Sequence, residues 1–429
     1  MTKCSNKNKK LIFTLLDLGL KKSGAYQLFD ESCLNEDNSF INFDTQVAIV
    51  THYLHTQGTS FDKTYAEKAN KFIDLWTNSD AVKQLLPNNI VCESPLQTYL
   101  FKDVFNIPFP SSENPKFTFI DLFAGIGGFR VAMQNLGGKC VFSSEWDSAA
   151  QRTYFANYGE MPFGDITSEE TKKYIPDNFD VLCAGFPCQA FSIAGYRKGF
   201  EDTRGTLFFD VAEIIRRKRP KAVFLENVKN LCSHDKGKTF EVIKNTLEEL
   251  GYIVYFKVMN AMEYANIPQN RERIFIICFD PKQISNYKNF TFPEKEPLTK
   301  SIHDCIDYNI SDAEYFYTEK MKHYDELVES ITSKETIYQW RRQYVRENKS
   351  KVCPTLTANM GTGGHNVPLI LTDKGIRKLT PKECLNFQGF PINYNFPPVI
   401  AKSSMYKQAG NSVVVPLIQR VCEQVISLI

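Results

Sequence analysis

The sequence lacks the features that would suggest an exported or membrane protein. It holds 12 cysteines in 429 residues, but no two stand at CxxC spacing, so we expect neither a disulfide framework nor a structural zinc site. No apolar run approaches the roughly 20 residues of a membrane span. The Lys-rich Met1–Lys10 precedes an amphipathic Leu11–Leu20 that Asp17 interrupts, unlike a secretory signal. These absences predict a cytoplasmic protein.

The chain also lacks an excess of charge of either sign. Lys and Arg number 51 and Asp and Glu 49, which gives a net charge of +2. Any contact with nucleic acid must therefore come from local basic patches. The length allows two or three domains with sizeable cores.

The chain divides into three regions by pattern. Residues 1–115 show apolar residues at helical intervals and end in the Pro-rich Ile107–Pro115, which indicates a helical N-terminal extension with a linker. From Phe117 to about Cys278, strands and helices alternate, which predicts an α/β fold with a doubly wound, mostly parallel sheet. From about Pro281 the regular pattern fails, which predicts a separate, smaller domain.

A glycine-rich turn follows the first of these strands. Phe117–Leu122 is followed by Phe123–Gly128 and a helix, an arrangement that lets a nucleotide approach the backbone closely. Asp121 at the mouth of the turn would repel a pyrophosphate and suit a cationic ligand, which favours S-adenosylmethionine over a dinucleotide. The residues that fit such a site are Asp121, Gly125, Gly127, Gly128 and Glu145. Trp146 offers a face for adenine and Asp165 an acceptor for its amino group, although Trp146 could equally pack in the core.

Three further groups follow strands of the same predicted sheet. Cys188 stands just after the run 179–184, where α/β sheets place their ligands, although most free cysteines are buried small hydrophobes. Glu226 ends a strand at the same edge and could assist a thiol nucleophile or cap the next helix. Arg271 and Arg273 alternate, so both point to one face; a surface ion pair with Glu272 is the alternative for one of them.

These motifs, in this order, resemble those of bacterial DNA cytosine-5 methyltransferases. The resemblance covers roughly residues 117–280 and 377–429. It is carried by Phe119–Arg130, Gly185–Phe209, Glu226–Val228, Gln269–Phe275, Arg377–Pro391 and Gly410–Val415. It implies an S-adenosylmethionine-dependent, Rossmann-like catalytic domain and a monomer that acts on duplex DNA.

The resemblance also implies roles for single residues. Cys188 attacks C6 of a cytosine, and Glu226 contacts N3 and the exocyclic amine. Arg273 holds O2 of the base, with Arg271 and Asn227 in support. The S-adenosylmethionine site would be lined by Phe123, Glu145, Trp146, Asp165, Ile166, Pro187, Asn411 and Val413 in addition to the glycine turn. The polar segment Gln189–Gly205 matches the family's mobile loop that closes over DNA.

A second domain must hold the DNA, because C6 can be reached only in a base flipped out of the duplex. Residues 336–376 are basic and aromatic, which suits contacts to phosphates and guanine edges, although a solvated charged surface is the general alternative. The candidates are Arg341, Arg342, Tyr344, Arg346, Lys349, Lys351, Thr355, Thr357 and Gly363. Tyr344–Pro368 is similar to recognition regions for GGNCC or GGWCC sites.

The predicted organisation is therefore a dispensable helical extension over residues 1–115, a catalytic domain over 116–281 completed by 404–429, and a target-recognition domain over 282–403. The predicted function is methylation of cytosine C5 in a short duplex DNA site, which protects the site from a cognate restriction enzyme. A cytosine-5 methyltransferase of RNA and a catalytically degenerate DNA-binding regulator are the alternatives.

Overall fold

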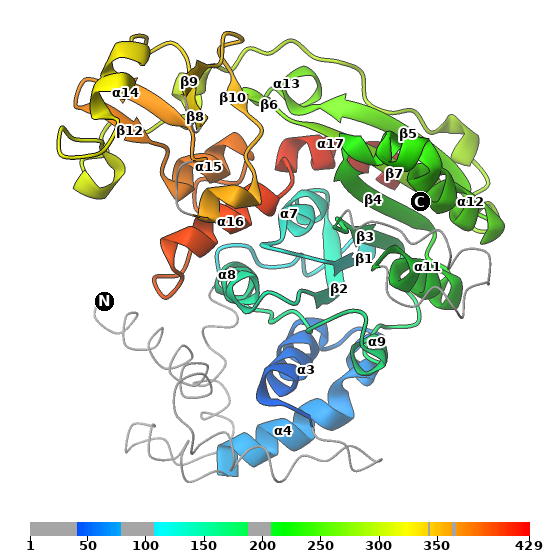
Figure 1. The fold of residues 1–429 in the computed structure, drawn as a ribbon. Coiled ribbons are helices and arrows are strands. Elements are labelled where there is room, and N and C mark those ends of the chain that lie inside the picture. Colours follow the sequence, from blue (N-terminus) through cyan, green and yellow to red (C-terminus); the bar gives the residue numbers. More distant parts are fainter. Residues whose placement is uncertain (1–40, 79–106, 188–206, 342–343, 363–365) are drawn as a thin grey trace.

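The computed structural model describes residues 41–78, 107–187, 207–341, 344–362 and 366–429. Their centre is a six-stranded sheet in the order β2-β1-β3-β4-β7-β5 (Figure 1). The strands are β1 (Phe117–Leu122), β2 (Gly138–Ser144), β3 (Val181–Ala184), β4 (Ala222–Val228), β5 (Ile253–Asn260) and β7 (Glu272–Phe279). β1 to β4 pair in parallel, and β7 runs antiparallel to β4 and β5. The predicted doubly wound, mostly parallel sheet is confirmed.

Both faces of the sheet are covered by helices. Because side chains alternate along each strand, successive residues enter two different cores. Phe119 faces the core under α7 (Gly128–Asn135) and α17 (Val415–Ile426). Its neighbour Ile120 faces the opposite core, under α11 (Leu207–Lys218) and α12 (Lys238–Glu249). The near-continuous apolar runs of the sequence thus reflect burial on two sides. Among the described residues, the sheet continues beyond β2 only as an isolated parallel bridge between Ser144 and Phe163.

The recognition region contributes a four-stranded sheet in the order β12-β11-β8-β9. Its strands are β8 (Tyr338–Arg341), β9 (Tyr344–Glu347), β11 (Leu369–Thr372) and β12 (Gly375–Lys378). A short parallel pair, β6 (Gln269–Asn270) with β10 (Cys353–Pro354), connects this region to the catalytic sheet. Ile302, Leu356 and Leu379 belong to the same apolar core as Phe119. The two regions therefore share a core, while the domain boundary near residue 282 stays a prediction.

Of the two N-terminal helices, α3 (Phe43–Thr56) lies beside β2, and α4 (Ala66–Asn78) packs against α3 (Figure 1, blue). Val50 and Phe72 join the same apolar core as Ile120. The predicted linker 107–115 is also held against the body, since Phe109 N–H donates to the Asn157 carbonyl at 3.1 Å. The other helices are α8 (Ser148–Tyr158), α9 (Glu169–Lys172), α13 (Ala261–Tyr264), α14 (Tyr324–Ser330), α15 (Pro381–Phe387) and α16 (Lys402–Asn411). None of the helices in the described ranges is long and apolar enough to cross a membrane.

Candidate active site

The glycine turn between β1 and α7 is shaped by backbone conformation and by close packing. Gly125 has φ +55° and Gly127 φ +79°, values that L side chains rarely adopt. At Gly128 an added Cβ would lie 2.6 Å from Cγ2 of Val413. The turn can therefore follow its path only with glycine, and it brings the start of α7 against the segment before α17.

Glu145 ties this turn to the carboxyl end of β2. Its Oε2 accepts the N–H of Gly125 at 2.8 Å, and its Oε1 accepts the N–H of Asp147 at 2.8 Å. Burial raises the pKa of this carboxyl group above its usual value. The next residue, Trp146, is 77% exposed, so the alternative of core packing does not apply to it.

A single pocket of about 510 Å³ joins the glycine turn to the predicted catalytic side chains. Its walls come from the ends of β1, β2, β3 and β4, from the start of β7, and from the segments near residues 357 and 411. Of the predicted catalytic and cofactor-binding residues, the pocket is lined by Phe123, Gly125, Gly128, Glu145, Trp146, Pro187, Glu226, Asn227, Arg271, Arg273, Asn411 and Val413. The carboxyl edge of the sheet thus gathers residues up to 290 positions apart in the sequence.

Glu226 and Arg273 form an ion pair at the floor of this pocket. On the antiparallel strands β4 and β7, Glu226 is paired with Phe275 and Arg273 with Val228, so the two side chains lie diagonally across the strands on one face. Nε of Arg273 is 2.9 Å from Oε1 of Glu226. The other carboxylate oxygen faces Gly185, whose missing Cβ would lie 3.6 Å away. The arrangement offers a fixed carboxyl group and a fixed guanidinium to one small planar ligand.

The side chains of Asn227 and Arg271 donate hydrogen bonds to backbone carbonyls in the pocket walls. Nδ2 of Asn227 donates to the Phe186 carbonyl at 2.9 Å, which fixes the chain just before Pro187. Nη1 of Arg271 donates to the Leu356 carbonyl at 2.7 Å and Nη2 to the Ser412 carbonyl at 2.5 Å. Through these hydrogen bonds both residues position the walls of the pocket, which is how they could fulfil the predicted supporting role.

Four predicted cofactor residues do not line the pocket. Gly127 packs against Tyr158, and Asp165 is exposed, with its Oδ1 accepting the N–H of Thr167. Ile166 is buried in the core. The prediction for Asp121 needs correction, because its carboxyl group is fully buried and both oxygens lack a hydrogen-bond partner. Burial raises the pKa of this carboxyl group well above its usual value, and the buried side chain does not line the pocket at the mouth of the turn.

Three predicted residues lie outside the described residues. They are Cys188, Arg342 and Gly363, and the whole segment Gln189–Gly205 also lies outside the described residues. Pro187, the residue before Cys188, lies on the wall of the pocket.

A second cleft, of about 450 Å³, opens beside the pocket between β4, β7 and the recognition sheet. Gln339 and Arg341 on β8 share a face with Arg346 on β9, because Gln339 and Arg346 are paired across the strands. Trp340 and Val345 point to the other face and pack on the small core of the recognition region. Val228, Arg273 and Thr357 line both the cleft and the pocket. A ligand in the cleft would therefore lie next to the Glu226–Arg273 pair.

The predicted DNA-contacting residues divide between this cleft and the surface. Arg341, Arg346, Thr355 and Thr357 line the cleft. Tyr344, which is 57% exposed, and the exposed Lys349 and Lys351 lie outside it. Sequence reasoning missed Gln339 and Asn348, which also line the cleft. The two-residue alternation of a strand, counted outward from Arg341 and Arg346, would have found them.

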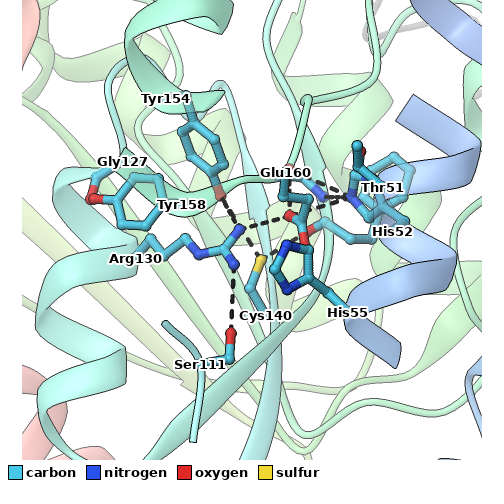
Figure 2. Close-up of polar contacts among 12 residues, drawn as sticks. Thr51, His52, His55, Ser111, Gly127, Arg130, Cys140, Tyr154, Tyr158 and Glu160 are labelled. Atoms are coloured by element: carbon cyan, nitrogen blue, oxygen red, sulfur yellow. Dashed lines mark hydrogen bonds and ion pairs between the residues drawn. The ribbon is translucent and has the colours of Figure 1, made fainter. Parts of the chain in front are cut away.

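A buried ionic network lies behind the glycine turn (Figure 2). Arg130 of α7 donates to Oε1 of Glu160 at 2.6 Å and to the Tyr154 hydroxyl at 2.9 Å. The same carboxylate oxygen accepts the Ser143 hydroxyl at 3.1 Å and lies 3.4 Å from Nε2 of His52. Burial opposes ionisation of Glu160, yet the charge of Arg130 lowers its pKa to about 2. Burial, which disfavours an imidazolium, lowers the pKa of His52 and lowers that of His55 to about 4.

We expect this network to make stability sensitive to acid. The unfolded chain binds protons at its histidines near pH 6.5, whereas folded His52 stays neutral to lower pH, so stability falls as the pH drops below about 6.5. Urea unfolding of wild type and His52→Gln at pH 7.5, 6 and 5 measures the effect. The variant should lose less stability than wild type over this range. The comparison between variant and wild type is needed because the raised pKa values of Asp121 and Glu145 make the folded state more stable as the pH falls, which opposes the effect of His52. Equal losses of stability in the two proteins would exclude His52 as the titrating group.

The geometry and the comparisons with known proteins define the same class. The chain belongs to the C-5 cytosine-specific DNA methylase family, whose model matches residues 117–427. The predictions of this family, of a DNA cytosine-5 methyltransferase and of its fold are thereby confirmed. No cluster of His, Cys, Asp or Glu suited to a metal ion occurs within the described part of the chain.

Among curated relatives, the chain is 53% identical over 311 residues to the type II methyltransferase M.Bsp6I of Bacillus sp. (strain RFL6). The match covers 71% of this chain and 96% of the relative. The type II methyltransferase M.HhaI of Haemophilus parahaemolyticus is 46% identical over 315 residues, covering 70% of this chain and 91% of the relative. The crystal structure of the S. pombe Dnmt2 methyltransferase has the same fold, with a TM-score of 0.55 and 18% identity over 72% of this chain and 98% of the other.

Proposed function

We propose that this protein transfers a methyl group from S-adenosylmethionine to C5 of a cytosine flipped out of a short duplex DNA site, as the modification enzyme of a bacterial restriction–modification system. The observation that supports this most is the meeting of the glycine turn and the Glu226–Arg273 pair in one pocket. A cofactor pocket and a base pocket must adjoin for a methyl group to pass directly between their ligands.

The pocket fits S-adenosylmethionine. The space above Gly125 is open, since an added Cβ would meet nothing within 4 Å, and the exposed Trp146 on the same wall provides a stacking surface. Glu145 has further lone pairs for ribose hydroxyls on oxygens that already accept the N–H groups of Gly125 and Asp147. S-adenosylmethionine supplies an electrophilic methyl group. A role for Asp165 and Ile166 at the adenine rests on the family resemblance alone.

In the proposed reaction the Cys188 thiolate adds to C6 of the cytosine. Glu226 hydrogen-bonds N3 or protonates it, so that the ring accepts the electron pair and C5 becomes nucleophilic. Arg273 orients Glu226 and holds O2 of the base. After methylation, loss of the C5 proton returns the electron pair and expels Cys188. Asn227 and Arg271 keep the pocket walls in place during these steps.

The recognition cleft supports duplex DNA as the substrate. It adjoins the base pocket, and its walls carry Arg341, Arg346 and Gln339, whose side chains suit purine edges in the major groove. Nη2 of Arg341 donates to Oε1 of Gln339 at 3.0 Å, which orients both groups before DNA binds. The site would be of the GGNCC or GGWCC type and would be methylated by a monomer acting on each strand in turn.

Incubation with labelled S-adenosylmethionine and either duplex DNA or transfer RNA tests the proposal. Transfer to DNA alone is expected, and transfer to RNA alone would establish the RNA alternative. Binding of DNA without transfer to either would establish the degenerate regulator. Bisulfite sequencing of DNA from expressing bacteria shows the methylated context, and methylation outside GG-N-CC-like sites would exclude the proposed specificity.

Arg346→Ala should reduce sequence discrimination more than general affinity. A bidentate arginine contributes about 1–3 kcal/mol of discrimination at a guanine, whereas a lysine on a phosphate contributes equally at every sequence. Lys349→Ala is the matched control, because Lys349 is basic and exposed but lies outside the cleft. Binding to cognate and unrelated duplexes is measured at fixed salt. If the two variants lose affinity in the same proportion on both duplexes, Arg346 does not read a base.

A further inference from the structure

β2 forms one edge of the catalytic sheet, and side chains from the N-terminal helices satisfy its outer side. Nε2 of His52 accepts the N–H of Ser143 at 3.1 Å. The Tyr65 hydroxyl, between the two helices, donates to the Val141 carbonyl at 2.8 Å. Val141 and Ser143 are two positions apart, so their backbone groups point to the same side. The Ser143 carbonyl accepts the N–H of Phe163. Where a seventh strand would pair, His52, Tyr65 and the backbone of Phe163 supply the partners instead.

The hydrogen bonds of His52 define its tautomer. Nδ1 lies 2.8 Å from the Ala48 carbonyl and can only donate to it. Nε2 is therefore the acceptor that Ser143 N–H requires. The imidazole is fully buried. Oγ1 of Thr51, the residue before His52, accepts the N–H of Met161 at 3.0 Å, so α3 also holds the segment that carries Glu160 (Figure 2).

This edge lies close to the cofactor pocket. Ser143 is two residues before Glu145, whose carboxylate holds the glycine turn, and three residues before Trp146. Ser143 also shares the carboxylate of Glu160 with Arg130 of α7. Displacement of Ser143 would therefore reach the pocket by two routes, through β2 and through α7. The family match begins at residue 117, so α3 and α4 lie outside it.

We propose that His52 is a positioning residue for the S-adenosylmethionine pocket: through Ser143 it fixes the carboxyl end of β2, so that Glu145 and Trp146 are held ready for the cofactor. The proposal rests on the function proposed above. It also changes the expectation for the extension, because residues 41–78 become part of the cofactor-binding half and only the remainder of 1–115 is left as dispensable.

The test uses the full chain and three substitutions. His52→Ala removes the acceptor. His52→Gln restores an acceptor at the end of a side chain of similar length. Thr56→Val is the matched control, since the partners of the fully buried Thr56 hydroxyl within the described residues are the His52 and Tyr53 carbonyls of its own helix. It weakens α3 without removing a contact to β2.

His52→Ala should raise the KM for S-adenosylmethionine about three- to tenfold, the equivalent of one buried hydrogen bond. The KM for DNA and the kcat at saturating cofactor should change less than about twofold. His52→Gln should recover most of the loss, and Thr56→Val should resemble wild type. An effect of Thr56→Val as large as that of His52→Ala, or an unchanged KM in His52→Ala, would overturn the proposal.

Hydrogen exchange in a peptide covering residues 138–147 provides a second measurement that needs no cofactor. Exchange should be faster in His52→Ala than in wild type and nearly normal in His52→Gln. If wild type binds no S-adenosylmethionine, the proposed function fails while exchange still decides whether His52 fixes β2. If His52→Ala does not fold, Tyr65→Phe removes one hydroxyl from the same edge, and normal exchange in that variant would refute the proposal.

Discussion

Cys188→Ser should abolish methyl transfer while folding and cofactor binding remain nearly intact. A serine hydroxyl is far less ionised than a thiol near neutral pH, so it cannot add readily to C6 of cytosine. Cys188 directly follows Pro187 in the sequence, and Pro187 lines the same pocket as Glu226. Transfer of labelled methyl to cognate duplex measures the activity, and unfolding by urea checks the fold.

Wild type should also form a covalent complex with duplex that contains 5-fluorocytosine, because fluorine at C5 blocks the final elimination. Cys188→Ser should form none. Cys232→Ser is a suitable control, since Cys232 is partly exposed and lies outside both the pocket and the cleft. Activity retained in Cys188→Ser would remove this residue from the nucleophile's role.

Glu226→Gln should lower the single-turnover rate by about 10²-fold or more and change DNA affinity much less. The amide keeps the size of the side chain but can neither protonate N3 nor hold the charge that Arg273 pairs with. Rapid quenching with enzyme in excess over DNA separates the chemical step from binding.

Glu272→Gln is the matched comparison for Glu226→Gln. Glu272 begins β7 next to Arg273, but it is partly exposed, pairs with Lys229 at 2.8 Å and lines the cleft. Its substitution should alter DNA binding slightly and leave the rate of the chemical step almost unchanged. Equal single-turnover rates in Glu226→Gln and wild type would instead assign Glu226 a structural role as a partner of Arg273.

The catalytic half could be predicted from sequence because its signals are local. The run Phe117–Leu122 has large apolar residues on both faces and is followed at once by a glycine turn, and this pattern corresponds to β1 as observed. The edge of a parallel sheet then brings Glu226, Arg273 and the turn together without further information. Asp121 shows where local reasoning failed: its place in the sequence is at the turn, but strand alternation sends its side chain into the core.

Contacts between distant segments could not be predicted. Nothing near His52 in the sequence indicates that its ring accepts a hydrogen bond from a strand 91 residues away. The basic residues around Arg341 and Lys349 have similar local chemistry, and only the pairing of β8 with β9 separates the cleft-facing side chains from the exposed ones. Such distinctions depend on tertiary packing, which composition and periodicity do not encode.

The hydrogen bonds of Arg271 bear on how new specificities arise in evolution. Its guanidinium joins the Leu356 carbonyl to the Ser412 carbonyl, and Gly410 packs so closely on the Thr357 backbone that a Cβ would lie 2.2 Å from it. The stretch from Cys353 to Gly361 therefore moves with the catalytic body, although it lies among the recognition strands in the sequence. Gene exchange between relatives that replaces only β8 and β9 can alter the bases read while leaving the transferase machinery whole. A crossover beyond Cys353 would instead separate the segment around Leu356 and Thr357 from Arg271 and Gly410, which contact it and must stay compatible with it.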